Sequence, residues 1–227
     1  MRERRFEPWF ALFVGVLKPP ITHWFNWRFE GEERVPPSGP LLVAANHISY
    51  LDPLAHGLFL WRRGRRPRYL AKQELFEVVG LRRVLRGMGQ IPVRRGTGDQ
   101  RPLERAEEAL QGGEAIVVYP EATVTRNADW TPGEGKTGLV RLSLATDVPV
   151  TPIAVWGAHH VWQKTGKGSL AFGRPIWLKA GPAIDLRNYS ERVDDVDALR
   201  EATEVVMGEL RGLVLDLRKR YPERWAR

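Results

Sequence analysis

His47 and Asp52 are the side chains of this sequence whose types and spacing best suit acid–base chemistry. An imidazole held beside a carboxylate has a fixed tautomer and a basic free nitrogen, which a general base requires. On a regular helix, five residues correspond to a rotation of about 140° from the starting face, so the two side chains would not meet. They can meet if the chain turns between them, with a strand delivering His47 and a helix beginning near Asp52.

The residues around the pair have the pattern of such a turn. Leu41 to Ala45 is an uncharged apolar run, typical of a strand buried on both faces of a sheet. Ser49 followed by Asp52 fits a capping box, and Pro53 fits the first turn of a helix. The pair alone is a weak signal, because a helix-capping aspartate near a partly buried histidine would give the same spacing in the sequence.

Composition restricts the chemistry further. The 227 residues are enough for one domain with its own core. Cysteine is absent, which excludes disulfides, thiolate metal sites and a cysteine nucleophile. There is also no Gly-x-Ser-x-Gly motif, so a covalent acyl-enzyme has no obvious nucleophile. The net charge of +8, carried mostly by arginine, favours an anionic partner, either nucleic acid or an anionic lipid surface.

The positive charge is concentrated between residues 62 and 95. Eleven Arg or Lys residues lie there against two Glu residues, which gives eleven minus two, or +9. Such a run is most often solvated surface. Nucleic-acid binding needs a reading motif as well, and we find no zinc-finger, RRM or helix-turn-helix pattern. We therefore expect a lipid surface and no nucleic acid. A non-catalytic basic membrane- or nucleic-acid-binding protein with a structural His-Asp pair is the alternative from another class.

Residues 1–30 are predicted to form an amphipathic membrane-interface segment, and residues 31–227 the folded domain. The uncharged run 9–17 is too short for a transmembrane helix, which needs roughly twenty apolar residues. Lys18-Pro19-Pro20 follows it in place of a signal-peptide cleavage site. Aromatic rings of the kind that favour a membrane interface are frequent in this segment: Phe6, Trp9, Phe10, Trp24, Phe25 and Trp27. Packing of the segment onto its own domain is the alternative.

After Asp52, apolar runs and amphipathic stretches alternate along the chain. This pattern predicts an α/β fold with a mixed, mostly parallel central sheet flanked by helices. We expect helices at 54–63, 76–88, 102–111, 137–146 and 195–220. Strands are expected at 68–71, 90–94, 115–119 and 150–155, with two short strands within 170–179.

Four sequence blocks resemble those of the glycerolipid acyltransferase family, in the family's order and roughly its spacing. The first is Asn-His-x4-Asp-Pro at residues 46–53, and the second runs from Lys72-Gln73-Glu74-Leu75 to Arg94. The third is Tyr-Pro-Glu-Ala-Thr at 119–123, and the fourth is Val-Pro-Val-Thr-Pro-Ile-Ala at 148–154. Lys136-Thr137-Gly138 is also similar to actinobacterial members. Each block alone is weak, but the four together are specific and cover residues 41–154.

The third block departs from the family pattern, Pro-Glu-Gly-Thr-Arg, at two positions. Ala122 replaces the glycine, and Val124 stands where the arginine is expected. Members with the form Glu-Gly-Thr-x-Thr-Arg would align Arg126 with the family's arginine. The alternative is that Arg126 lies on a surface loop and points at solvent.

The resemblance implies direct transfer of an acyl group from a thioester, acyl-CoA or acyl carrier protein, to the free hydroxyl of lysophosphatidic acid. No other cofactor and no metal are implied, and the enzyme would be peripheral on the cytoplasmic face of the cell membrane. Another lysophospholipid or polar-lipid acceptor is the close alternative. The expected site residues are His47 and Asp52 for catalysis and, for substrate binding, Lys72, Arg94, Glu121, Thr123 and Arg126.

The implied roles follow the chemistry of each side chain. His47 would take the proton of the acceptor hydroxyl, while Asp52 holds the imidazole's tautomer. The cations lie at predicted strand exits, where open α/β sheets place ligands, and would grip the acceptor's phosphate. Glu121 and Thr123 would contact its glycerol part. For Lys72 and Arg94, simple charge balance with neighbouring glutamates is the alternative.

Overall fold

The computed structural model describes residues 15–16, 19–94, 99–163 and 165–226. In these ranges seven strands form one sheet in the order β1-β7-β6-β2-β5-β3-β4. Each neighbouring pair is parallel except β6 and β7, which are antiparallel. The predicted mixed, mostly parallel sheet is therefore confirmed. The strands are β1 (Asn26–Glu30), β2 (Leu41–Ala45), β3 (Pro67–Lys72), β4 (Ile91–Val93), β5 (Ala115–Val118), β6 (Val150–Trp156) and β7 (Pro175–Ala180).

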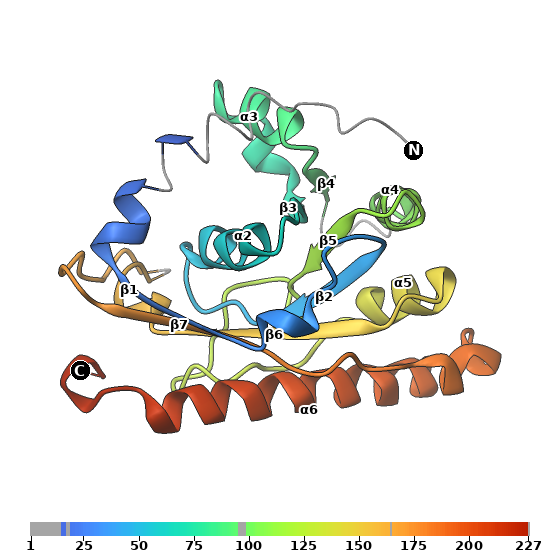
Figure 1. Ribbon diagram of the computed structural model, residues 1–227. Coiled ribbons are helices and arrows are strands. Elements are labelled where there is room, and N and C mark those ends of the chain that lie inside the picture. Colours follow the sequence, from blue (N-terminus) through green and yellow to red (C-terminus); the bar gives the residue numbers. More distant parts are fainter. Residues whose placement is uncertain (1–14, 17–18, 95–98, 164, 227) are drawn as a thin grey trace.

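Helices cover both faces of the sheet. Figure 1 shows α2 above the sheet and the long α6 along its lower face, with α3 at the end of the molecule remote from α6. Residues 19–24 are helical, and the further α-helices of the described residues are α2 (Asp52–Arg62), α3 (Leu81–Gly87), α4 (Arg101–Gln111), α5 (Gly138–Thr146) and α6 (Val196–Arg220). Short 3-10 helices are η1 (Glu32–Arg34), η2 (Gln73–Phe76), η3 (Ala158–His160), η4 (Arg187–Arg192) and η5 (Glu223–Trp225).

Strand β2 lies at the centre of the sheet and is buried along its whole length. Its side chains alternate between the two faces, as the period of a strand requires. Leu41 and Val43 join a core with Phe59 of α2, whereas Leu42 joins a second core with residues of α4, α5 and α6. Burial of a side chain of this size stabilises the fold by about 1.5–3 kcal/mol. The uncharged sequence of β2 follows from this double burial.

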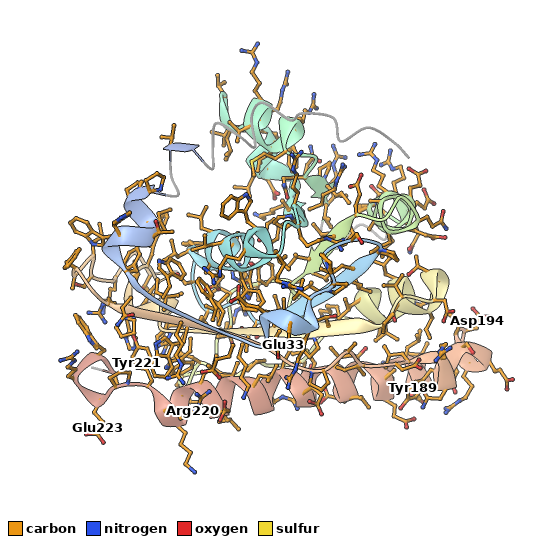
Figure 2. The ribbon with its side chains drawn as sticks, viewed as in Figure 1. Glu33, Tyr189, Asp194, Arg220, Tyr221 and Glu223 are labelled. Atoms are coloured by element: carbon orange, nitrogen blue, oxygen red, sulfur yellow. The ribbon has the colours of Figure 1, made fainter. Side chains whose placement is uncertain are left out.

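Helix α6, which the sequence predicts at 195–220, lies along the lower face of the sheet. The Asp195 carboxylate caps its first turn by accepting hydrogen bonds from the backbone N–H groups of Asp197 and Ala198. At its other end, Arg220 forms ion pairs with Asp216, at 2.5 Å, and with Glu30 of β1, at 2.8 Å. Figure 2 shows Arg220 and Tyr221 near the C-terminal end of the molecule. The Arg220–Glu30 pair ties the edge strand to the helix.

Two predicted elements are wrong in detail. The predicted helix 76–88 is shortened to α3, Leu81–Gly87, because Gly80 has φ of +86°, which a continuing right-handed helix cannot contain; residues 77–80 form the turn between η2 and α3. In the range 170–179 only β7 is a strand. Leu170 and Phe172, which suggested an earlier one, are exposed and belong to no strand.

Strand β1 lies inside the segment predicted to dock on a membrane. Phe25 is buried just before it, and Trp27 packs against the core and stacks on Phe29 with ring centroids 5.9 Å apart. Trp24 is exposed, while Phe6, Trp9 and Phe10 fall outside the described residues. No helix in the described ranges is both long and apolar enough to cross a bilayer. Membrane docking of the segment before β1 stays a prediction.

Candidate active site

The turn between β2 and α2 brings His47 and Asp52 together. His47 Nδ1 lies 2.9 Å from Asp52 Oδ2, and the same oxygen accepts hydrogen bonds from the backbone N–H groups of Ile48, at 2.6 Å, and Ser49, at 2.7 Å. Asp52 is fully buried, and its carboxylate lies in the first turn of α2. Asp52 Oδ2 acts as an acceptor toward both backbone N–H groups, so a hydrogen bond with His47 Nδ1 takes its proton from the ring. His47 Nδ1 is then the protonated ring nitrogen, and Nε2 is the basic one.

Three hydrogen bonds from other parts of the chain hold this turn in place. The Asn46 side chain forms two hydrogen bonds with the backbone of Val155 in β6. Its amide nitrogen donates to the Val155 carbonyl, at 3.0 Å, and its oxygen accepts from the Val155 N–H, at 2.7 Å. The backbone N–H of Thr125 donates to the His47 carbonyl, at 2.7 Å. The segment directly after the third block therefore meets His47, because β2 and β5 are adjacent parallel strands.

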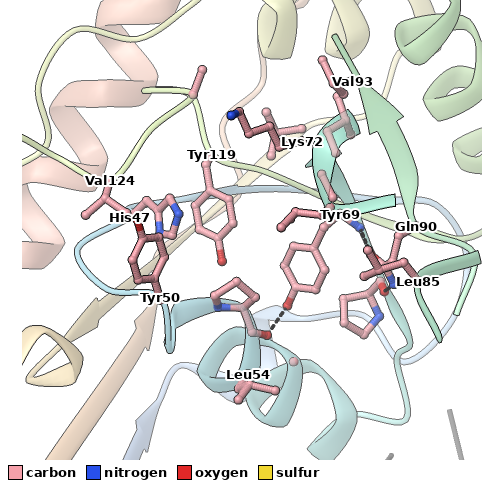
Figure 3. A pocket seen from close by; sticks show the side chains of 18 of the residues that line it. His47, Tyr50, Leu54, Tyr69, Lys72, Leu85, Gln90, Val93, Tyr119 and Val124 are labelled. Carbon is pink, nitrogen blue, oxygen red and sulfur yellow. Dashed lines mark hydrogen bonds between the residues drawn. The ribbon is translucent and has the colours of Figure 1, made fainter. Parts of the chain in front are cut away.

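Aromatic rings line one side of His47. Tyr119 stacks on the imidazole with centroids 4.3 Å apart, and Tyr69 stacks on Tyr119 at 6.1 Å. Figure 3 shows these three rings following one another along a cavity wall. The Tyr69 hydroxyl donates to the Pro53 carbonyl, at 2.7 Å, which fixes the row against α2. Burial raises the pKa of both tyrosines, so they stay neutral. The stacked Tyr119 ring shields one face of the His47 imidazole from water.

The neighbouring His56 has a structural environment. It is fully buried, and its Nδ1 donates to the Asp52 carbonyl one turn earlier in α2, at 2.9 Å. Burial lowers the pKa of His56, which keeps it neutral. His159 and His160 are also removed from the site: His159 stacks on Trp130 at 4.8 Å, and burial lowers its pKa to about 2. His47 is the histidine that lines the cavity.

The cavity beside His47 has a volume of about 1010 Å³ and lies between α2, β3 and α3. This is at the upper limit of the ~300–1,000 Å³ typical of small-molecule sites. Its walls are mainly aliphatic and aromatic side chains, among them Leu54, Leu58 and Trp61 of α2 and Leu81, Val84 and Leu85 of α3. An elongated apolar group such as a fatty acyl chain suits this lining, and its reactive end would lie at His47.

Sequence and structure comparisons identify the family of this chain. A family profile described as acyltransferase matches residues 26–156, from β1 to the end of β6. The chain belongs to the acyltransferase family. A chloroplastic 1-acyl-sn-glycerol-3-phosphate acyltransferase of Brassica napus is 27% identical over 174 residues, which cover 74% of this chain and 49% of that protein. The 1-acyl-sn-glycerol-3-phosphate acyltransferase of Bacillus subtilis is 25% identical over 168 residues, covering 72% of this chain and 80% of that protein.

A solved structure extends the likeness over most of the chain. The crystal structure of the 1-acyl-sn-glycerophosphate (LPA) acyltransferase PlsC from Thermotoga maritima is similar with a TM-score of 0.67 and 26% identity. The similarity covers 94% of this chain and 81% of that one. The chain spans about half the length of the Brassica napus relative and of a Mycoplasma genitalium relative. The family expected from the four sequence blocks is thus confirmed.

The structure brings two of the predicted substrate-binding residues to the acyltransferase cavity. Lys72 and Thr123 both line it together with His47. The Lys72 amine also lies 3.1 Å from the Glu74 carboxylate, and both side chains are about half exposed, with 49% and 60% of their areas accessible. Solvent screening makes such a pair weak, so it leaves Lys72 able to bind another anion.

The other three predicted residues do not line the cavity. Arg94 borders a separate hollow of about 270 Å³. Glu121 turns into the loop, where one carboxylate oxygen accepts the Gly133 N–H at 3.0 Å and burial raises the pKa of the carboxyl. Arg126 is exposed, and its side chain has no hydrogen bond or ion pair with another described residue. Its correspondence to the family's arginine stays a prediction.

The backbone conformation of Ala122 bears on one of the two positions where the third block departs from the family pattern. Its φ is +55°, in the left-handed region where glycine is ordinarily found. Its N–H donates to the Tyr119 carbonyl, at 2.9 Å, closing the turn that follows β5. The backbone keeps the conformation for which the family uses glycine, and an alanine side chain is strained there by about 1–2 kcal/mol.

Sequence reasoning missed Lys136 as a site residue. It lines the cavity with Lys72, and its backbone N–H donates to the Pro120 carbonyl, at 2.9 Å, which places it against the third block. Its amine has no hydrogen bond or ion pair with another described residue. The resemblance of Lys136-Thr137-Gly138 to other members was the available signal, but the sequence does not show that this segment folds back onto Pro120.

Proposed function

We propose that this protein transfers a fatty acyl group from a thioester donor to the free hydroxyl of 1-acylglycerol-3-phosphate, giving phosphatidic acid. The supporting observation is the position of the His47–Asp52 pair beside a mainly apolar cavity of about 1010 Å³, which His47 lines. Relatives named for this reaction support the choice of acceptor. The donor is acyl-CoA or acyl carrier protein, and we place the protein at the cytoplasmic face of the cell membrane.

In the proposed reaction His47 Nε2 removes the proton of the acceptor hydroxyl while its oxygen attacks the thioester carbonyl carbon. The negative charge of Asp52, 2.9 Å from Nδ1, stabilises the imidazolium that forms. The carbon–sulfur bond then breaks, and the imidazolium returns its proton to the departing thiolate. The ester is formed, the thiol leaves, and His47 is neutral again. No covalent enzyme intermediate is needed.

Lys72 and Lys136 are the cations best placed to bind the acceptor's phosphate, because both line the cavity. Thr123, on the same wall, would contact the glycerol part. Glu121 would act indirectly by holding the loop through Gly133. Arg94 and Arg126 are outside the cavity and would reach the phosphate only from its edge.

The departures in the third block favour one second candidate, a reaction of the same type on another lysophospholipid or polar-lipid acceptor. Arg126 is exposed and does not line the cavity, so the residues that would bind a phosphate monoester differ from those of the family pattern. A panel of acceptors distinguishes the two, because only a phosphate monoester would depend on both Lys72 and Lys136.

The experiment is to measure thiol release from acyl-CoA with and without lysophosphatidic acid, and to identify the lipid product by mass spectrometry. We expect release that depends on the acceptor, with phosphatidic acid as product. His47→Ala should lower turnover by at least ~10²–10³. Thiol release without acceptor dependence, or an alanine variant that keeps more than about a tenth of the activity, would contradict the proposal.

A further inference from the structure

The turn between η2 and α3 presents apolar side chains to solvent. Leu75, Val78, Val79 and Leu81 are all exposed, and Val79 is 98% exposed. Gly80, the residue directly before α3, has a positive φ, so the chain turns there and leaves Val79 as the apex, the most exposed of the four side chains. Exposed apolar side chains gathered in this way usually mark a contact surface. We call residues 75–86 the η2–α3 tip.

The tip also has positive charge that lacks partners within the described chain. Arg82, Arg83 and Arg86 of α3 are exposed, and none has a hydrogen bond or ion pair with another described residue. Arginines on α6 are arranged differently: Arg200 and Arg211 each pair with a carboxylate, at 2.9 and 2.6 Å. The α3 arginines are therefore available to an anionic partner, and phosphate groups suit their planar donors.

The same tip forms part of the wall of the cavity beside His47. Leu75 and Leu81 line the cavity although they are exposed, and Val84 and Leu85 line it from the next turn of α3. Apolar residues at i, i+3 and i+4 thus face the cavity, whereas the arginines face outward. An apolar apex, unpaired arginines beside it and a lipid-sized cavity behind it suit a bilayer surface better than a folded protein surface.

We propose that the η2–α3 tip docks on an anionic membrane, with Val78 and Val79 inserted and the three arginines at the phosphate level. Lipid substrates would then pass from the bilayer into the cavity beside Leu75 and Leu81 without crossing water. This route for substrates rests on the proposed function, whereas the docking does not. The tip lies at the end of the molecule remote from α6, so α6 would face away from the membrane (Figure 1).

A fluorescent label tests the docking directly. The chain has no cysteine, so Val79→Cys carries an environment-sensitive dye at one position. With vesicles of phosphatidylglycerol and phosphatidylcholine, its emission should shift to the blue and be quenched by nitroxide-labelled lipids. Leu215→Cys, at a residue of α6 that is 50% exposed, is the matched control and should remain unchanged. An unchanged Val79 label, or equal changes at both positions, would overturn the proposal.

Replacement of the arginines tests the charge. Arg82→Gln, Arg83→Gln and Arg86→Gln together should lower the affinity for these anionic vesicles by about 10²-fold, since each basic residue near such a surface contributes roughly fivefold. The affinity of the parent for neutral vesicles should be lower and insensitive to these changes. Equal binding of the parent and the triple variant to anionic vesicles would contradict the role of the arginines.

Activity measurements separate this proposal from the proposed function. The triple arginine variant should turn over water-soluble, short-chain donor and acceptor at the parental rate, because none of the three arginines lines the cavity. If the parent forms phosphatidic acid but the Val79 label stays in water, the docking is wrong and the function stands. If the label enters the bilayer but no phosphatidic acid forms, the function is wrong and the docking stands.

Discussion

Asp52→Asn should separate the electrostatic role of the carboxylate from its role in shaping the turn. The asparagine oxygen can still accept from His47 and from the N–H groups of Ile48 and Ser49, which all bond to one oxygen at 2.6–2.9 Å. The negative charge is lost, however. At an effective dielectric constant of about 20, charges ~4 Å apart interact by ~4 kcal/mol, so the imidazolium loses about that stabilisation. This corresponds to a decrease of about 10³-fold in kcat.

The fold should survive the same change at a measurable cost. Three hydrogen bonds to a charged acceptor become bonds to a neutral one, at about 1 kcal/mol each. The other carboxylate oxygen is buried without a hydrogen-bond partner among the described residues, so an amide placed there is unsatisfied. We expect the free energy of unfolding to fall by about 3–5 kcal/mol, measured by urea denaturation. Assays at low temperature keep the variant folded.

A double-mutant cycle gives the decisive comparison. If Asp52 acts only through the imidazole, His47→Ala with Asp52→Asn should be no slower than His47→Ala alone. Asp216→Asn, which removes a carboxylate bonded to Lys179 at 2.7 Å on the far side of the sheet, is the control and should keep its kcat. A folded Asp52→Asn enzyme within about tenfold of the parent, or two additive losses, would refute the general-base mechanism.

Three further predictions concern the cavity and the third block. Ala122→Gly should raise the free energy of unfolding by about 0.5–1 kcal/mol, because the relief of left-handed backbone strain exceeds the cost of the added entropy of the unfolded chain. Ala109→Gly within α4 is the control and should lower the free energy of unfolding by about as much. Gly57 of α2 lines the cavity, and an added Cβ there meets the Tyr69 hydroxyl at an ordinary 3.5 Å, so Gly57→Leu should fill part of the cavity. The kcat/KM for long-chain donors should then fall by about fourfold for each methylene that no longer fits, and equal losses for short donors would contradict this. Lys136→Ala should lower kcat/KM for lysophosphatidic acid by roughly ten- to 150-fold and leave the donor's KM unchanged. A larger loss in Arg126→Ala would instead indicate that Arg126 binds the phosphate, as the sequence predicts.

The sequence by itself determined the local features of the site. The apolar run before His47, the five-residue spacing and Pro53 together predict a strand, a turn and a helix, and the structure contains all three. These features are readable because each depends on residues that are close in the chain: strand period and turn chemistry are local interactions. The predicted capping box is wrong in detail, because α2 begins at Asp52 and the Ser49 hydroxyl accepts the Leu51 N–H instead of capping the helix. The departure at Ala122 is also visible in the sequence, although its positive φ is not.

Only the tertiary structure decided which distant side chains share the cavity. Lys136 reaches it because its loop returns to Pro120, whereas Arg126, three residues after Thr123, is left on the surface. Likewise, the Tyr119 ring covers His47 because β5 pairs with β2 in one particular register. Register and loop path are set by packing over the whole sheet, where burial of many side chains outweighs the preference of any short segment. For that reason the sequence predicts the chemistry of His47 and Asp52, and the fold selects the residues that can serve it.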